Sequence, residues 1–149
     1  MRIRLSLMAL LLAATGAAHA AQGQRAETSG EYTVHYNALP TTVLGAEVAR
    51  GYGIVRSATR GFLNVAVLRQ RPGEDLGTAV PARVEASVRN LSGQRNVIEL
   101  REIRDQDAIY YFGEFATRGE DTLRFELQVT PEGADRPIPV RFEQGFPGN

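Results

Sequence analysis

The sequence contains no cysteine, no lysine and no tryptophan. Without cysteine, the chain can form no disulfide and cannot be anchored as a lipoprotein through an amino-terminal cysteine. All 17 basic residues are arginine, and 17 acidic residues balance them, so the formal net charge is zero. A neutral chain offers no electrostatic reason to expect nucleic acid or an anionic membrane surface as a partner.

Long apolar runs are also scarce. The one such run, residues 5–14, follows two arginines and leads to Ala18-His19-Ala20. A basic start, a short apolar run and a small–x–small ending are typical of a secretory signal peptide. The run is shorter than the roughly 20 residues that a membrane anchor needs. We therefore expect a signal peptide over residues 1–20, cleaved after Ala20, and a periplasmic mature protein with no membrane span.

The rest of the chain is long enough for one domain with its own core, and it shows no repeat and no linker. Residues 21–29 are polar, and we expect them to form a disordered tail. The single domain is then expected over residues 30–146.

Apolar and polar residues alternate with period two along this domain. In the first such segment, Tyr32, Val34 and Tyr36 alternate with His35 and Asn37. Such alternation is typical of a half-buried β-strand. Turn residues separate about seven segments of this kind, which predicts an all-β antiparallel sandwich. The expected strands are residues 31–37, 61–68, 82–89, 97–103, 108–115, 123–129 and 138–142.

The last two strands predict a hairpin with one particular register. Setting Val129 opposite Ile138 also sets Phe125 opposite Phe142 on the core face. The same register brings opposite charges together across the outer face. A slip of one residue would expose both phenylalanines, so we expect this register alone.

The strands on either side of Asn90–Gln94 predict another hairpin. Here we expect Ala86 near Leu100 and Glu85 near Arg101, because apolar and polar residues then share faces.

Seven ordered segments carry a family resemblance, namely residues 34–38, 52–57, 60–65, 90–94, 101–103, 107–111 and 140–144. Together they resemble the exported bacterial proteins grouped as domain of unknown function family 4426. The resemblance covers nearly the whole mature chain. It implies a periplasmic, immunoglobulin-like β domain of proteobacteria, and it implies no activity.

Few residues are suited to catalysis or metal binding. A nucleophile needs a base beside it, and beyond the expected signal peptide the sequence offers one histidine, His35, and no cysteine. The serines lie in no Gly-x-Ser-x-Gly turn. Zinc sites need three or four nitrogen or sulfur ligands. The sequence therefore predicts no catalytic residue, no metal site and no cofactor.

Two polar features remain as candidates for a binding site. His35 and Asn37 project from the polar face of the first strand, and Arg56 and Arg60 flank the turn before the most apolar strand. Arginine can bind carboxylate or phosphate with a planar pair of donors. These four residues are our candidate ligand or partner site, suited to an anionic group. The alternative is a separate structural role for each, with the arginines in ion pairs.

The leading functional interpretation is a non-enzymatic binding or interaction module of the cell envelope. Its partner would be another envelope protein or an anionic ligand, because sandwich domains offer sheet faces, edges and loops for binding. One alternative is a small periplasmic hydrolase or isomerase that uses His35. Another is a small-ligand carrier, which would need a concave apolar pocket.

Processing of the exported protein gives the first test. Intact mass spectrometry should show a chain that begins at Ala21, because the small–x–small pattern ends at Ala20. A mature start more than about three residues away would contradict this cleavage site.

Overall fold

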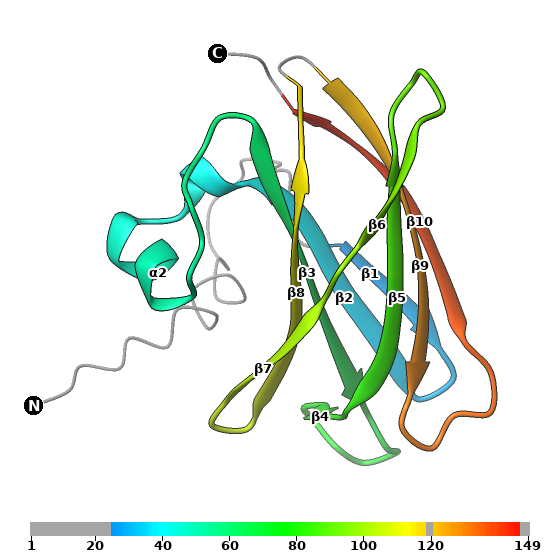
Figure 1. Cartoon of the computed structure of the whole chain (residues 1–149). Helices are drawn as coiled ribbons and strands as arrows, with labels where there is room; N and C mark the ends of the chain where they lie inside the picture. Colours follow the sequence, from blue (N-terminus) through cyan, green and yellow to red (C-terminus); the bar gives the residue numbers. More distant parts are fainter. Residues whose placement is uncertain (1–24, 119–120, 147–149) are drawn as a thin grey trace, which may run out of the picture.

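The structure, a computed structural model, describes residues 25–118 and 121–146. The expected signal peptide and residues 21–24 of the expected tail lie outside this part of the chain. Two antiparallel β-sheets pack face to face as a sandwich (Figure 1). Sheet A has the order β1-β2-β3-β8-β7, with β4 beside β3, and sheet B has the order β10-β9-β5-β6.

Sheet A consists of β1 (Arg25–Ser29), β2 (Tyr32–Pro40), β3 (Arg60–Arg69), β4 (Thr78–Ala79), β7 (Arg101–Asp105) and β8 (Ala108–Ala116). Sheet B consists of β5 (Ala82–Arg89), β6 (Arg95–Ile98), β9 (Asp121–Pro131) and β10 (Ile138–Phe146). A 3-10 turn, η1 (Thr41–Val43), and a short helix, α2 (Ala46–Gly51), lie between β2 and β3. The predicted all-β sandwich is confirmed. Within the described residues, no helix has the length and apolar character needed to cross a membrane.

The core lies between the two sheets. Alternate residues of β9 and β10 are buried and exposed, as the period-two pattern predicts. Their register is the expected one, with Val129 opposite Ile138 and Phe125 opposite Phe142. The two phenylalanine rings stack with centroids 4.7 Å apart. Each such cross-strand pair stabilises the sheet by roughly 0.2–1 kcal/mol, so this hairpin is a strongly specified part of the core.

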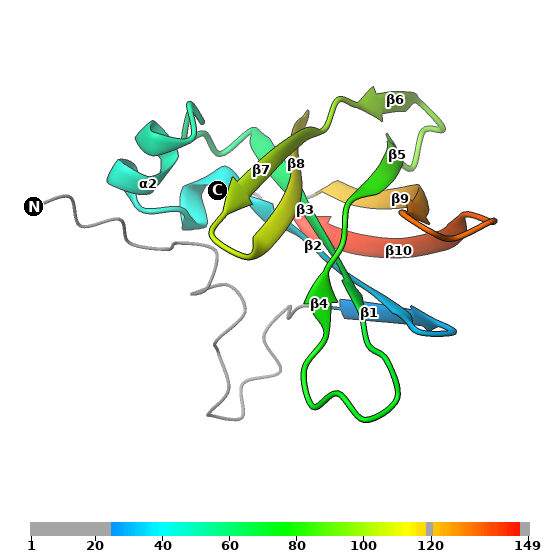
Figure 2. The same cartoon turned by 90° about the horizontal axis from the view of Figure 1, so that it is seen from below.

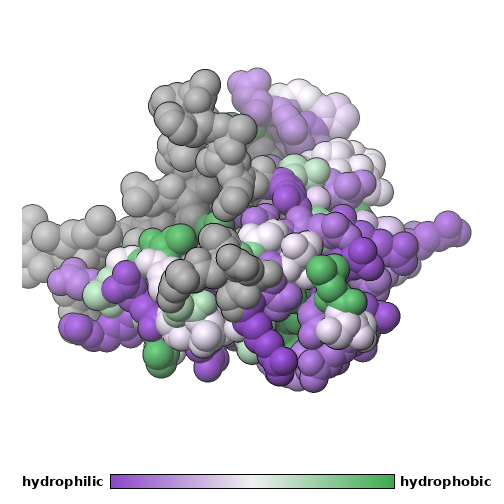
Figure 3. Space-filling model, turned by 90° about the horizontal axis from the view of Figure 1, so that it is seen from above, coloured by the Kyte–Doolittle hydropathy of each residue, from purple (hydrophilic) through white to green (hydrophobic). Residues whose placement is uncertain are grey.

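Five large hydrophobic residues are exposed in the described part of the chain. Seen from above, the described surface is mainly hydrophilic, with small separate hydrophobic areas (Figure 3). Isolated residues of this kind are normal on soluble proteins. The large exposed ones are Val43, Val55, Leu76, Leu91 and Val97.

The expected disordered tail is wrong for residues 25–29. They form β1, which pairs with β2 along its whole length. The Arg25 guanidinium donates a hydrogen bond to the Glu143 carbonyl oxygen at 2.9 Å and lies over the Phe142 ring. Residues 25–29 are mainly polar, yet they form a strand because β2 supplies backbone hydrogen-bond partners and Arg25 reaches sheet B.

The hairpin around Asn90–Gln94 has a different register from the expected one. Ala86 lies opposite Ile98, two residues before Leu100. The turn closes tightly, since the Asn90 backbone N–H donates to the Gln94 carbonyl oxygen at 3.1 Å and Gly93 has a positive φ of 86°. A positive φ suits glycine because it has no side chain to clash.

The strand expected over residues 97–103 is in fact divided between the two sheets. Its first part, β6, pairs with β5 in sheet B, and its second part, β7, pairs with β8 in sheet A. Viewed from below, the chain runs from β6 across to β7 beside β8 (Figure 2). We call the connecting residues 99–100 the crossover.

Gly113 of β8 allows this close crossing. A Cβ atom at this position would lie 2.6 Å from the Glu99 carbonyl oxygen and 2.7 Å from side-chain atoms of Ile98 and Leu100. Contacts that short require the backbone to move, because one of the partners is a main-chain oxygen. The missing side chain therefore lets the crossover pack directly on sheet A.

Replacing Gly113 by alanine should destabilise the fold by about 1–3 kcal/mol, the usual range for overpacking. Thermal melting followed by circular dichroism measures the change. Gly145→Ala is the matched control, since a Cβ there meets nothing within 4 Å. Equal melting temperatures for the two variants would show that the crossover does not depend on Gly113.

Candidate functional site

A compact segment protrudes from sheet A between two paired strands. Strands β2 and β3 pair from Tyr32–Arg69 to Pro40–Gly61, so a tight turn could join them. Instead residues 41–59, which we call the lobe, contain η1 and α2 and extend from the side of sheet A away from sheet B (Figure 1). Connections between neighbouring strands are usually much shorter, and long ones often carry a function.

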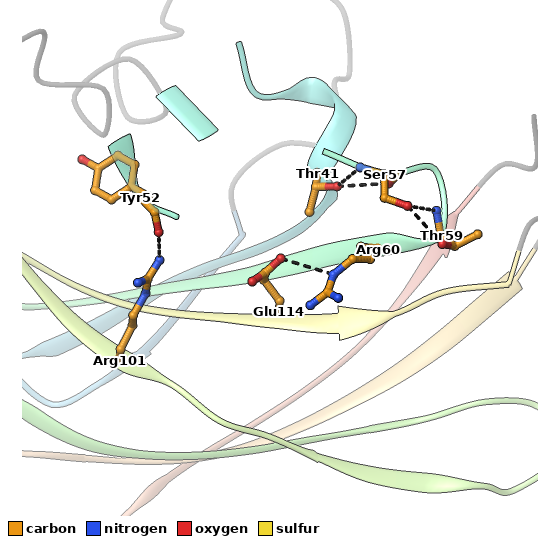
Figure 4. A network of polar contacts seen from close by, with 7 residues as sticks. All are labelled: Thr41, Tyr52, Ser57, Thr59, Arg60, Arg101 and Glu114. Carbon is orange, nitrogen blue, oxygen red and sulfur yellow. Dashed lines mark hydrogen bonds and ion pairs between the residues drawn. The ribbon is translucent and has the colours of Figure 1, made fainter. Parts of the chain in front are cut away.

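Hydrogen bonds close the lobe at its base. The buried Thr41 hydroxyl accepts from the Ser57 N–H at 2.8 Å and donates to the Ser57 carbonyl oxygen at 3.0 Å (Figure 4). The Arg56 guanidinium donates to the Thr42 carbonyl oxygen at 3.1 Å. These bonds join the two ends of the lobe, so it leaves the sheet as one closed unit.

Apolar packing and one arginine hold the lobe against the outer face of sheet A. Leu44, Ala49 and Ile54 pack with Phe62 and Phe112, whose rings stack 5.0 Å apart. From β7, the Arg101 guanidinium donates to the carbonyl oxygen of Tyr52 (Figure 4). The lobe therefore has a defined position over one end of the sheet.

A row of polar side chains lies on the same outer face. Asn37 of β2 is directly opposite Asn64 of β3, and Glu114 of β8 is opposite Phe62, which shares a face with Asn64. Arg60 also shares that face, and its Nε atom is 3.4 Å from Glu114 Oε1 (Figure 4). We call Asn37, Asn64, Arg60 and Glu114 the polar stripe.

Three oxygen atoms of the polar stripe lack a hydrogen-bond donor. Asn37 and Asn64 are 9% and 8% exposed, and the Oδ1 atoms of both are buried without a partner. Glu114 Oε1 is also buried without one, because its ion pair with Arg60 lacks the geometry of a hydrogen bond. Each such group costs about 1–3 kcal/mol when unsatisfied. A donor from outside the protein, either water or a ligand, is therefore expected at these oxygens.

The structure places three of the four candidate residues from the sequence on one face of sheet A and the fourth elsewhere. His35 and Asn37 share the outer face, and Arg60 lies on it as well. Arg56 is at the base of the lobe, bonded to the Thr42 carbonyl oxygen. Both arginines thus have structural partners. Arg56 bonds to a backbone carbonyl oxygen and Arg60 pairs with Glu114, as the alternative of separate structural roles would have it.

Sequence reasoning missed Asn64 and Glu114. Asn64 lies inside the strand 61–68, whose other residues are almost all apolar, and an asparagine in such a position was an available signal. Glu114 carried no comparable signal, because its neighbour across the sheet depends on how β3 and β8 pair.

His35 is poorly placed for catalysis. Within the described residues, no hydrogen bond joins its imidazole to a carboxylate or a hydroxyl, and its cross-strand neighbours are Ala26 and Ala66. Burial lowers the pKa of His35 below its ordinary value of 6.5, which favours the neutral imidazole near pH 7. A catalytic base normally needs both a nucleophile and an orienting partner within hydrogen-bond reach.

Fold and site together define an antiparallel β-sandwich with a lobe and a polar stripe on the outer face of one sheet. The domain of unknown function family DUF4426 has a family model that matches residues 26–147, nearly all of the described chain. The chain belongs to this family, as its resemblance predicted. The search of curated proteins found no match.

Three solved structures share this fold. A DUF4426 family protein from Pseudomonas aeruginosa PAO1 is 28% identical with a TM-score of 0.70, over 87% of this chain and 98% of that one. A copper-bound variant of FetP from uropathogenic Escherichia coli strain F11 is 15% identical with a TM-score of 0.60, over 84% and 95%. A copper-bound protein from Campylobacter jejuni is 16% identical with a TM-score of 0.54, over 84% and 96%. The last two share the fold alone.

The burial of His35 gives a test of this geometry. Nuclear magnetic resonance titration should place its pKa below 6.5, and His19 does not interfere if the signal peptide is absent. Since the unfolded chain then binds the proton more tightly, the free energy of unfolding should fall as pH decreases through 6.5 toward the folded pKa. A pKa at or above 6.5 would contradict the burial of this side chain.

Proposed function

We propose that this protein is a non-enzymatic binding module of the periplasm, and that its polar stripe receives an ammonium group of a ligand or of a partner protein. The observation that carries the proposal is the set of three buried acceptor oxygens without donors, on Asn37, Asn64 and Glu114. An ammonium group carries three N–H donors and no acceptor. It therefore matches the polarity of these oxygens.

The kind of atom buried at the stripe supports a cationic group over an anionic one, because all three unpartnered atoms are acceptor oxygens. Glu114 contributes the negative charge, and its side chain is 24% exposed, whereas that of Arg60 is 48% exposed. Arg60 can thus turn toward solvent while Glu114 remains at the sheet surface. The anionic ligand expected from the sequence would instead meet three acceptor oxygens without donors.

The periplasm is supported by the sequence and by a similar fold. The expected signal peptide directs the chain to export. The FetP structure of Escherichia coli strain F11, 15% identical to this chain, comes from protein expressed in the periplasm.

Copper, which the FetP and Campylobacter proteins bind, does not fit the residues of this chain. Protein copper sites use imidazole, thiolate and thioether ligands. Of these ligand types the described residues supply only the imidazole of His35, since both methionines, Met1 and Met8, precede residue 25. No group of three or more histidine, cysteine or acidic side chains gathers within that part of the chain.

Binding can be measured with propylammonium as the probe and acetate as the anionic comparison. The side-chain amide signals of Asn37 and Asn64 should shift on titration with propylammonium and should not shift with acetate, at equal ionic strength. Asn64→Leu should weaken binding about tenfold while keeping or raising the melting temperature, since it removes unsatisfied polar atoms.

Asn96→Leu is the matched control, because Asn96 is exposed on β6 in the other sheet. It should leave propylammonium binding unchanged. Shifts caused by acetate, or equal loss of binding in the two leucine variants, would refute the proposal.

A further inference from the structure

A second surface lies where β6 leaves sheet B. The ladder between β5 and β6 ends at Ala86 and Ile98, after which the crossover carries the chain to sheet A. Strand β5 continues to Ala82 and pairs there with β9 alone. Figure 1 shows β5 and β7 diverging beyond this point. The sandwich is therefore open along one side of β5.

The backbone of β5 presents unused hydrogen-bonding groups at this opening. The Ala82 N–H donates to the Tyr111 hydroxyl, and the Asn90 N–H donates to the Gln94 carbonyl oxygen. Both groups therefore point away from β9. Because alternate residues of a strand point the same way, Val84 also directs its N–H and C=O to this side. No partner for either group is present in the described part of the chain.

The opening is a groove of about 550 Å³. Partly buried Val84 and Leu100 form its apolar wall and pack against the core. Two residues before Val84 on β5, the Ala82 N–H is already used, because the Tyr111 hydroxyl accepts from it at 2.8 Å and donates to Glu102 at 3.1 Å. A strand rises roughly 3.3 Å per residue, so the stretch of β5 from Ala82 to Ala86 is about 13 Å long. This length leaves room for about three or four residues of an added strand.

Charge around the groove selects the occupant. Glu85, Glu99 and Glu126 line it together with Arg95, and Glu85 is ion-paired with Arg83 outside the lining. Neither Glu99 nor Glu126 has an ion-pair partner among the described residues. An occupant with basic side chains therefore complements this rim.

We propose that the groove binds an extended basic segment of a partner protein, which adds as a short strand beside Val84. The backbone of that segment pairs with the Val84 N–H and C=O, as in other cases of strand addition. Its side chains alternate, so that apolar ones contact Val84 and Leu100 while basic ones face Glu99 and Glu126. This site is on a different sheet from the polar stripe, and each can fail without the other.

A labelled hexapeptide of alternating valine and arginine serves as the probe, with fluorescence anisotropy of the mature protein as the readout. Glu99→Lys and Glu126→Lys should each weaken binding about tenfold. Glu27→Lys is the matched control, because it makes the same change in net charge on an exposed position of β1. It should leave the affinity unchanged.

Backbone pairing is tested by methylating the peptide nitrogens. Two peptides are compared, one methylated at the odd-numbered backbone nitrogens and one at the even-numbered nitrogens. Only one of these two sets faces β5, so one peptide should lose binding and the other should keep it. In the protein, Val84→Pro removes the N–H that faces the groove and leaves the bonds to β9 in place. It should abolish binding while the circular dichroism spectrum stays that of a β protein. If Val84→Pro does not fold, the methylated peptides and the charge variants still test whether the segment binds beside Val84.

Three results would overturn the proposal. They are no peptide binding at about 1 mM, equal weakening by Glu27→Lys and Glu99→Lys, and equal binding of both methylated series. A dimer in solution that protects the Val84 N–H from hydrogen exchange would also overturn it, because a second copy would then occupy the groove.

Discussion

The close packing of the crossover on Gly113 is the constraint on which much of this structure depends. Only a residue without a side chain leaves room there for the Glu99 carbonyl oxygen and its neighbours. The crossing ends the β5–β6 ladder and so opens the groove beside Val84. It also supplies β7, from which Arg101 reaches the Tyr52 carbonyl oxygen and holds the lobe. A single close approach thus connects both candidate binding surfaces.

The two surfaces differ in the physical reason for binding. At the polar stripe, folding buries oxygen atoms that have no donor, which lowers stability and leaves hydrogen-bonding capacity for an added group. At the groove, the backbone of Val84 lacks a neighbouring strand, and unpaired edge groups favour pairing with another chain. In both cases the fold leaves polar groups unsatisfied, as is common at functional sites.

Residue patterns were a reliable guide wherever a single strand or a single hairpin decided the outcome. The alternation in β9 and β10 specified both the buried face and the register, because any slip would expose Phe125 and Phe142. The pattern failed at residues 97–103, where one run of mixed apolar and polar residues, read as a single strand, serves two sheets. Alternation records which side of a strand is buried, and it carries no information about which sheet buries it.

By itself the sequence determined the class of fold, the buried face of most strands, and the placement of His35 and Asn37 on one outer face. These follow from the period of two, a local property of an extended chain. Only the tertiary structure decided that Asn64 and Glu114 join Asn37, that Arg60 pairs with Glu114, and that Arg56 closes the lobe. Those neighbours come from strands and loops far apart in the chain. The ladder between β3 and β8 and the packing of the lobe bring them together, and no local pattern encodes either.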